Sequence, residues 1–492
     1  MPATLERPKN TGDRSPSRRD ALRRGAGLLV AALGVPLLAA CQGSGTVVNP
    51  ATAGTSARAS TSSVVATTTT TGSATGTAAA TVVAASTSPP PAAAANGQTL
   101  QLWIIGGKIQ ADVLTGKVLP DLYQTTAGIK EVQVLSLGSW QDLFTKLVTA
   151  LAGNTGPDLA RIKDYWSPEF AVRGVLLPLD AYLSKQQEIT SDKYGTARWD
   201  SAHWKGKTYS LPFTTFVEDY FVNDTLLQQA GLQPAQTWEE QVTNAQKLTD
   251  PAKQQWGYML YDYGASQSGA WDYISLLWQA GGEFTNADRT KLAFNSDPGI
   301  TALSYQTDLI WKYKVCLPPG TPTSNVVQND KVGQWHNGCW VNAAYPTSAP
   351  TLKYSAHLLP ALKDDNRSVI IGGNNIGGFK GTKYPDQVWQ TLAWIGSEQS
   401  DLVWNSATGY LPVRTANWQK APFSTDPNWK VIIEQVQRKD TQPIPIFVGY
   451  EEVTDKIGAE LQAAYQNKKT PKQALADAEL EGTQLMQKYS QG

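Results

Sequence analysis

The sequence is poor in residues that bind metals and form disulfides, since its 492 residues contain three histidines and three cysteines. None of the histidines, His203, His336 and His357, has a second ligand at the short spacings typical of zinc sites. We therefore expect neither a zinc protease nor another histidine-based metal centre, and no cofactor. Each histidine is expected to be structural or at the surface.

Motifs for phosphate binding and nucleophilic catalysis are also missing. The glycine cluster Gly372–Gly378 fits neither the GxxxxGK nor the GxGxxG spacing, and no GxSxG elbow occurs. We interpret the cluster as a backbone crossing or a tight turn. Acidic residues are numerous, so a glycosidase that uses two carboxylates for catalysis stays open as an alternative.

Neither sign of charge is in large excess. Lys and Arg total 42, as do Asp and Glu, and beyond residue 40 the counts are 35 and 39, a net charge of about −4. A chain of this composition lacks the basic surface typical of nucleic-acid-binding proteins. We therefore expect no nucleic-acid partner.

The first 40 residues have the pattern of an export signal. Arginines at positions 14, 18, 19, 23 and 24 precede an apolar run, Gly25–Ala40, whose sixteen residues are too few for a membrane span of about 20. The small residues before Cys41 resemble a bacterial lipobox, and Ser17–Leu22 resembles the twin-arginine export pattern. We predict a signal peptide over residues 1–40 and a lipidated Cys41. An uncleaved signal anchor is the alternative.

Residues 42–97 have the composition of a flexible tether. Thr, Ala, Ser, Gly and Pro dominate, with a single charged residue, Arg58, and no aromatic residue. Such a stretch cannot bury enough apolar surface to offset the entropy of ordering. A random chain of these 56 residues has an r.m.s. reach of about 40 Å. We predict that residues 41–97, the lipidated cysteine and its tether, hold a globular body beside a membrane.

From Gln98 onward the composition is that of a globular α/β protein. Short strands at Leu100–Ile105 and Val132–Leu135 alternate with helices, which predicts a parallel, doubly wound sheet. The 395 residues exceed what one core usually supports, so we expect two domains. Folds of this kind bind ligands beyond the carboxyl ends of their strands.

Several element boundaries are marked in the sequence. Ser139 and Thr237 are each followed three residues later by an acidic residue, and Thr470 by a glutamine, which is the pattern of a capping box at the start of a helix. Single strands are expected at Tyr220–Val222 and Trp340–Ala343. With Cys41 assigned to a lipid, Cys316 and Cys339 form either a disulfide or two buried thiols.

Aromatic residues with a polar edge are the strongest functional signal. The chain has 17 Trp and 19 Tyr, against 10 Phe and 3 Met. A flat ring stacks on the C–H face of a sugar, while nearby polar side chains bind its hydroxyl groups. The composition therefore favours a carbohydrate-binding cleft, although core packing is the commoner role of a single Trp.

Short segments follow one another in a characteristic order along residues 98–492. They include Gly156–Asp158, Gly174–Asp180, Tyr209–Phe213, Gln279–Phe284, Asn337–Trp340 and Thr408–Arg414. In this order they resemble the extracellular solute-binding proteins of bacterial ABC importers, in the carbohydrate-binding family that includes the maltose-binding proteins. The resemblance implies a non-enzymatic receptor that captures a solute outside the cell, closes on it and delivers it to a permease.

The resemblance also implies the two-lobe periplasmic-binding-protein fold of type II. Each lobe would be a doubly wound sheet flanked by helices, with the ligand cleft between the lobes. We place lobe 1 at residues 98–215 and 378–435, and lobe 2 at residues 216–377 and 436–492. Pro212-Phe213 and the glycine cluster lie near the predicted crossings between the lobes.

Candidate ligand-binding residues follow from the resemblance. Trp340 and Trp271 fall where relatives present sugar-stacking aromatics. Lys108 matches a lysine that in relatives binds a hydroxyl or carboxylate of the ligand. Asp164, with Trp166 beside it, falls where relatives place an acidic residue that accepts a hydrogen bond from a ligand hydroxyl. The remaining candidates are Trp140, Phe216, Glu218, Asn375, Arg414 and Tyr450. Relatives of the maltose type have polar residues where Ile105, Gly107 and Phe216 stand, which argues against maltose itself.

The expected partners are a mono- or oligosaccharide and the permease subunits of an ABC importer. The protein is expected to be a monomer, anchored by its lipid to the outer face of the cell membrane. Two alternatives stay open: a tethered extracellular glycoside hydrolase, and the same fold with another cargo, namely a polyol, glycerophosphodiester, sugar acid or peptide. Turnover would separate a hydrolase from a receptor.

Overall fold

The computed structural model describes residues 97–490, except for 262, 264–266, 322 and 324. The predicted signal peptide, Cys41 and tether therefore lie outside the described residues. No helix within the described range is long and apolar enough to cross a membrane.

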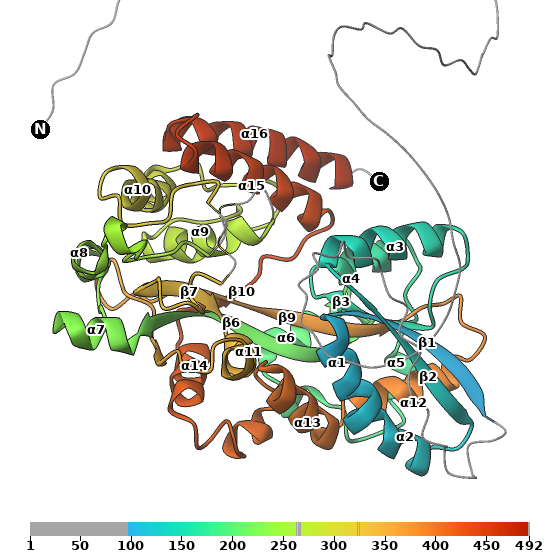
Figure 1. The fold of residues 1–492 in the computed structure, drawn as a ribbon. Coiled ribbons are helices and arrows are strands. Elements are labelled where there is room, and N and C mark those ends of the chain that lie inside the picture. The colour runs from blue at the N-terminus through green and yellow to red at the C-terminus, as the bar shows by residue number, and fades with distance from the viewer. Residues whose placement is uncertain (1–96, 262, 264–266, 322, 324, 491–492) are drawn as a thin grey trace, which may run out of the picture. The chain divides into compact units, whose positions relative to one another are not determined.

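A mixed sheet runs through the molecule (Figure 1). Its strand order is β2-β1-β3-β9-β6-β7, with β10 paired to β9 and β8 paired to β6. The strands are β1 Gln98–Ile105, β2 Ile129–Leu137, β3 Leu159–Lys163, β6 Leu211–Asn223, β7 Gln334–Gly338, β8 Tyr354–His357, β9 Val369–Gly378 and β10 Thr441–Pro443. A separate pair is formed by β4 His203–Trp204 and β5 Lys207–Thr208. β1 is parallel to β2 and β3, as the sequence predicted, whereas β9 is antiparallel to β3 and β6.

Two long strands, β6 and β9, connect the strands on either side of them. They pair antiparallel, with Leu211 opposite Ile376 and Phe216 opposite Gly372, and both are buried along their whole length. Since β9 contains the glycine cluster, the cluster is a crossing strand and not a tight turn. A β-carbon at Gly373 would lie 2.0 Å from the carbonyl oxygen of Thr214, so glycine permits this close approach of the two strands.

Helices cover both faces of the sheet (Figure 1). Those grouped around β1–β3 are α1 Gly107–Val113, α2 Leu119–Thr125, α3 Trp140–Ala152, α4 Trp166–Val172, α5 Asp180–Leu183, α12 Pro385–Ile395 and α13 Glu398–Thr408. The short α6 Thr196–Asp200 lies beside β6 and β9. Those grouped around β6–β8 are α7 Asp224–Ala230, α8 Trp238–Leu248, α9 Gln267–Gln279, α10 Asp297–Trp311, α11 Val341–Ser348, α14 Pro427–Gln437, α15 Tyr450–Tyr465 and α16 Pro471–Ser490.

The predicted helix starts are confirmed. The hydroxyl oxygens of Ser139, Thr237 and Thr470 accept hydrogen bonds from the backbone N–H three residues later, at 3.1, 3.1 and 3.2 Å. The predicted strand at Trp340–Ala343 is wrong, because β7 ends at Gly338 and Trp340 is the N-cap of α11. A segment of four residues is too short for its pattern to distinguish a strand from a helical turn.

Cys316 and Cys339 are both free and buried, so the disulfide, one of the two predicted alternatives, does not form in this structure. Burial raises the pKa of both thiols far above the ordinary range. The two cysteines therefore act as small hydrophobic residues in the core.

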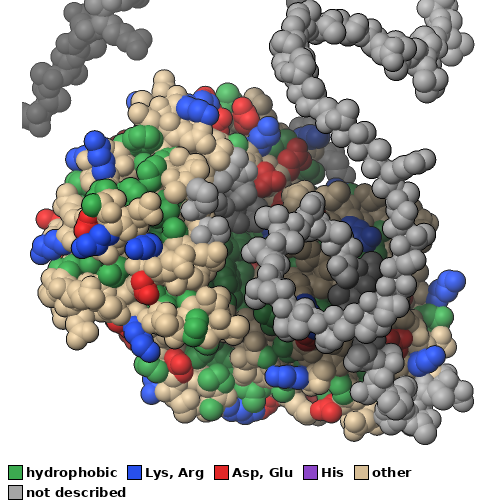
Figure 2. Space-filling view, in the orientation of Figure 1, with side chains coloured by type: hydrophobic (Ala, Val, Ile, Leu, Met, Phe, Trp, Pro, Cys, Tyr) green, Lys and Arg blue, Asp and Glu red, His purple; other side chains and the backbone are tan. Residues whose placement is uncertain are grey.

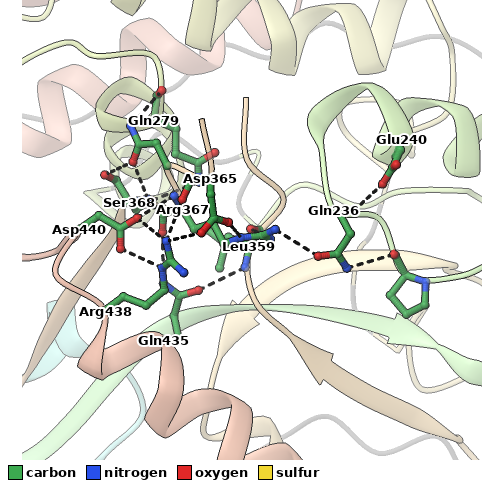
Figure 3. Close-up of polar contacts among 12 residues, drawn as sticks. Gln236, Glu240, Gln279, Leu359, Asp365, Arg367, Ser368, Gln435, Arg438 and Asp440 are labelled. Carbon is green, nitrogen blue, oxygen red and sulfur yellow. Dashed lines mark hydrogen bonds and ion pairs between the residues drawn. The ribbon is translucent and has the colours of Figure 1, made fainter. Parts of the chain in front are cut away.

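A polar network fixes the start of β9 (Figure 3). The Arg367 guanidinium donates to the Leu359 carbonyl oxygen at 2.7 Å and to the Gln236 side chain at 3.1 Å, while its backbone carbonyl accepts from Gln435 on α14 at 3.2 Å. Gln435 is also bonded to the backbone N–H of Leu359 at 3.2 Å. The predicted end of lobe 1 at residue 435 thus falls within a helix that packs beside β8.

Charged side chains are spread over the face seen in Figure 2, and neither sign gathers into a large patch there. The near balance of the two signs in the sequence accounts for this mixed surface. Surface charge on this face therefore does not mark a functional site.

Candidate functional site

A cavity of about 320 Å³ lies where β3, β6 and β9 meet the helices on both sides. Seven of its lining residues are aromatic: Trp140, Tyr165, Phe216, Tyr261, Trp271, Trp340 and Tyr410. The others are Gly106, Ile109, Gln110, Lys163, Ala343, Ala344, Gly373, Asn374, Ala407 and Thr408. A cavity of this size with ring faces and a few polar groups is typical of a small-molecule site.

One wall of the cavity is a continuous group of rings. Phe216 on β6 stacks on Trp271 of α9, with 4.7 Å between the ring centroids. Trp340 meets the edge of Phe216 at 5.7 Å and tilts toward Tyr410 at 5.9 Å. Contacts of this kind hold each ring in one orientation, so the wall presents preformed flat faces to a ligand.

A further ring at the cavity, that of Trp140, has a second ring behind it. Trp140, the first residue of α3, packs against the buried Trp166 of α4 at 5.6 Å, edge to face. Trp166 is fixed in turn because its Nε1–H donates to Glu451 Oε2 at 2.8 Å. Trp166 is therefore a support for Trp140 and does not line the cavity itself.

Lys163, the last residue of β3, brings a positive charge to the cavity. Its Nζ lies 3.2 Å from Glu451 Oε1 and 5.6 Å from the Trp140 ring centroid, and the side chain is almost fully buried. Burial lowers the pKa of Lys163, while the carboxylate of Glu451 opposes that shift. The ammonium is thereby held in a fixed position at the edge of the aromatic wall.

Arg161, two residues earlier on the same strand, lies behind the cavity with no exposed surface. Its Nε donates to Asn374 Oδ1 at 3.0 Å, and a second guanidinium nitrogen donates to Gln110 Oε1. The guanidinium also lies 5.2 Å from the ring centroid of Trp140 and 5.1 Å from that of Tyr410. Arg161 thus contacts four side chains that line the cavity.

Four of the eleven predicted ligand-binding residues line this cavity: Trp340, Trp271, Phe216 and Trp140. Tyr450, like Trp166, lies one layer behind it, where its buried ring packs on Tyr165 at 4.6 Å. A role of these residues in ligand binding stays a prediction, and the cavity is where it can be tested.

Asp164 and Asn375 do not line the cavity. Both are buried and bind Arg198: Asp164 Oδ2 pairs with it at 2.8 Å, and Asn375 Oδ1 accepts from it at 2.8 Å. Burial raises the pKa of Asp164, which the Arg198 charge opposes. The neighbours Lys163 and Asn374 reach the cavity instead. Asn374 and Asn375 are adjacent in β9 and so point to opposite faces of the sheet, whereas Asp164 follows the last residue of β3.

Lys108 and Arg414 also lie away from the cavity. Lys108 is 74% exposed and pairs with Asp112 one helical turn later, at 2.5 Å. Arg414 is buried elsewhere, donating to the carbonyl oxygens of Gly396 and Glu188 at 2.8 and 2.9 Å. The residues of α1 that do line the cavity are Ile109 and Gln110.

Sequence reasoning missed Tyr261, Tyr165, Lys163, Asn374, Gln110 and Tyr410, which all line the cavity. Tyr410 lies within the segment Thr408–Arg414 that supported the resemblance, so the signal for it was present. Lys163, Tyr165 and Asn374 each adjoin a predicted residue, and the direction in which each side chain points was the missing information.

Glu218, the last predicted residue, belongs to a buried polar cluster behind the aromatic wall. Its carboxyl group lies beside the carboxyl group of Asp272 and the imidazole of His336. One oxygen or nitrogen atom from each of the three side chains lies within 4.8 Å of the other two. In the described part of the chain these three residues form the one group that could hold a metal ion. His336 Nδ1 is 2.8 Å from Asp272 Oδ1, so a network of shared protons also accounts for the cluster.

Burial raises the pKa of Glu218 well above its ordinary value, and the nearby Asp272 adds to the shift. Glu218 then keeps its proton in the folded protein at pH values where the unfolded chain has lost it. The stability that this provides is present below the unfolded pKa and is lost as the pH rises through the folded pKa.

We therefore expect Glu218→Gln, which cannot ionise, to lose less stability than the wild type when the pH rises from 5 to 9. Thermal unfolding at several pH values measures this difference. Glu239→Gln, at an exposed position of α8, is the matched control and should follow the wild-type profile. An unchanged profile for Glu218→Gln would contradict the protonated state of Glu218.

Comparisons with known proteins agree with this architecture. Residues 107–401, more than half of the chain, match the model of the family described as bacterial extracellular solute-binding protein. The sn-glycerol-3-phosphate-binding periplasmic protein of Pectobacterium atrosepticum is 25% identical over 314 residues, which are 58% of this chain and 68% of the relative.

Solved structures show the same fold. An ABC transporter solute-binding protein of Thermotoga lettingae, bound with α-D-tagatose, has a TM-score of 0.72 and 25% identity, covering 79% of this chain and all of the other. One from Agrobacterium radiobacter K84, in complex with ribitol, has a TM-score of 0.68 and 21% identity, covering 79% and 99%. The second likeness concerns the fold alone.

These matches confirm the predicted α/β periplasmic-binding-protein fold and the predicted absence of an enzymatic role, and they remove the glycoside hydrolase alternative. The family works outside the cytoplasm, as its description states. The chain belongs to the bacterial extracellular solute-binding proteins, the non-enzymatic receptors of ABC transporters.

Proposed function

We propose that this protein is a receptor for a sugar or polyol that closes on its ligand and delivers it to the permease of an ABC importer. The observation that carries this proposal is the cavity with seven aromatic lining residues beside Lys163, Gln110 and Asn374. Ring faces stack on the C–H faces of a sugar or extended polyol, and the polar groups bind its oxygens.

The ligands of the structural neighbours support this choice of cargo. The Thermotoga lettingae protein binds α-D-tagatose and the Agrobacterium radiobacter protein binds ribitol, a ketose and a polyol of similar size. A cavity of about 320 Å³ suits a ligand of one or two sugar units better than a peptide.

We further propose that the receptor acts as a monomer tethered by a lipidated Cys41 after removal of residues 1–40. Residues 42–97 would then let the body reach a permease without fixing its orientation. The division into lobe 1 and lobe 2 at the predicted boundaries belongs to the same proposal, with β6 and β9 as the crossings that bend on closure. Cys41→Ser would release the protein from the membrane with ligand binding unchanged.

Intrinsic tryptophan fluorescence tests the proposed cargo. We expect a saturable change on titration with at least one member of a panel of ketoses, aldoses, disaccharides and polyols, because Trp140, Trp271 and Trp340 line the cavity. The bound compound should be recovered intact. A folded protein that responds to peptides and to none of these compounds would contradict the proposal.

A further inference from the structure

Building on the proposed function, we infer that the sugar or polyol carries an anionic group, a carboxylate or phosphate, which binds to the amide and hydroxyl donors that Arg161 holds against the cavity. Arg161 would act as a positioning residue and the source of positive potential. The inference rests on the pairing of Arg161, on the orientation of its neighbours and on the charge around the cavity.

Arg161 is a buried cation without an acidic partner. It has no exposed surface, and within the described part of the chain no carboxylate lies within ion-pair distance of it. By contrast, the other fully buried arginine near the cavity, Arg198, pairs with Asp164 at 2.8 Å. An unpaired buried charge is costly, so a counter-charge supplied by a ligand would be strongly favoured at this position.

The guanidinium fixes the orientation of its neighbours. Because a guanidinium only donates hydrogen bonds, the oxygen atoms of Asn374 and Gln110 must face Arg161, and their NH₂ groups are left for other partners. The guanidinium also lies 5.1 Å from the ring centroid of Tyr410, which brings the O–H donor of this residue near the same positive charge. All three side chains line the cavity. They therefore present donors to a ligand, and the charge behind them strengthens those donors.

The charge around the cavity has the same sign. Lys163 is the one charged residue among the described lining residues, and no described Asp or Glu lines the cavity. Lys163 is paired with Glu451 and is also near Asp455, so the charge beside the cavity that has no acidic partner is that of Arg161. Thr408 offers an acceptor, since its hydroxyl donates to the Trp404 carbonyl oxygen. Such a site, in which donors outnumber acceptors, suits a sugar or polyol with one acidic group.

Calorimetric titration with matched pairs of compounds tests this inference. Each pair is a neutral sugar or polyol and its own acid, for example galactose with galacturonate, ribitol with ribitol 5-phosphate, and tagatose with tagatose 6-phosphate. We expect the acid of at least one pair to bind ten-fold or more tightly than its neutral parent. The carboxylate and phosphate arms show which anion is preferred.

Two variants connect the preference to Arg161. Gln110→Glu supplies a carboxylate to Arg161 with almost no change of volume, and we expect it to reduce the preference for the acid to three-fold or less. Arg161→Met should have the same effect. Should Arg161→Met not fold, the result for Gln110→Glu decides the test, because Gln110 lies on the partly exposed helix α1. Gln141→Glu, at an exposed position of α3, is the matched control and should keep the preference.

The outcomes separate this inference from the proposed function. Neutral parents that bind as tightly as their acids, or a preference that survives Gln110→Glu, would overturn the inference and leave the sugar or polyol receptor in place. A folded protein that binds no member of any pair would overturn both.

Discussion

Replacing Trp340 with alanine is expected to weaken ligand binding by roughly 30- to 1,000-fold, which corresponds to about 2–4 kcal/mol. Trp340 touches Phe216, Tyr410 and, at 6.5 Å, Tyr261, so it joins the rings of the wall to one another. Its loss would remove a stacking face and also free its neighbours to move. Both effects act on the same cavity, which is why this change is expected to exceed that of any single polar contact.

Calorimetric titration of the ligand found by fluorescence measures the effect. Trp340→Phe, which keeps a ring, should lose less than Trp340→Ala. Trp311→Ala is the matched control, since Trp311 is 44% exposed and bonds to the Tyr465 carbonyl oxygen, away from the cavity. Binding by Trp340→Ala within three-fold of the wild type would show that the aromatic wall is not where the ligand binds.

Asp164→Ala is expected to lower the free energy of unfolding by about 3–5 kcal/mol, the usual result of removing one partner of a buried ion pair. Asp164 pairs with Arg198 at 2.8 Å and also accepts from the backbone N–H groups of Tyr165 and Gly373 at 2.9 and 3.0 Å. Arg198 in turn donates to the carbonyl oxygens of Thr214 and Asn374, at 3.2 Å each. The pair thus joins β3, β6 and β9 at the point where they support the cavity.

Urea unfolding measures this loss, and two comparisons identify its cause. Asp112→Ala removes an acid from the exposed pair with Lys108 and should cost no more than about 1 kcal/mol. The double variant Asp164→Leu/Arg198→Met should be more stable than Asp164→Ala, because it leaves no buried charge unpaired. If Asp164→Ala cost no more than Asp112→Ala, the burial of this pair would not matter to stability.

Local sequence signals predicted the elements well. The capping boxes at Ser139, Thr237 and Thr470 marked real helix starts because a cap depends on residues within one turn of each other. The wrong strand at Trp340–Ala343 had no such local signal. This segment packs closely on Gly409, where a β-carbon would lie 2.7 Å from the Trp340 carbonyl oxygen, and such a contact with a distant part of the chain is not visible in the local sequence.

The site was predicted in part, and the errors have one physical cause. Asp164 and Lys163 are adjacent, yet one turns to Arg198 and the other to the cavity. Which of the two faces a ligand depends on Arg198, which is 34 residues away, and on the strands that cover each face. A single sequence does not contain that pairing, whereas Trp271 and Trp340 could be predicted as cleft residues from the resemblance to the family.

The burial of Cys316 and Cys339 makes this receptor well suited to use as a reagentless optical sensor. Thiol-reactive dyes attack thiolates, and burial keeps both of these thiols protonated and out of reach. Ile109 lines the cavity yet is 69% exposed. A cysteine placed there in residues 98–492, which lack Cys41, would be the preferred labelling position, and its dye would report occupancy of the cavity directly.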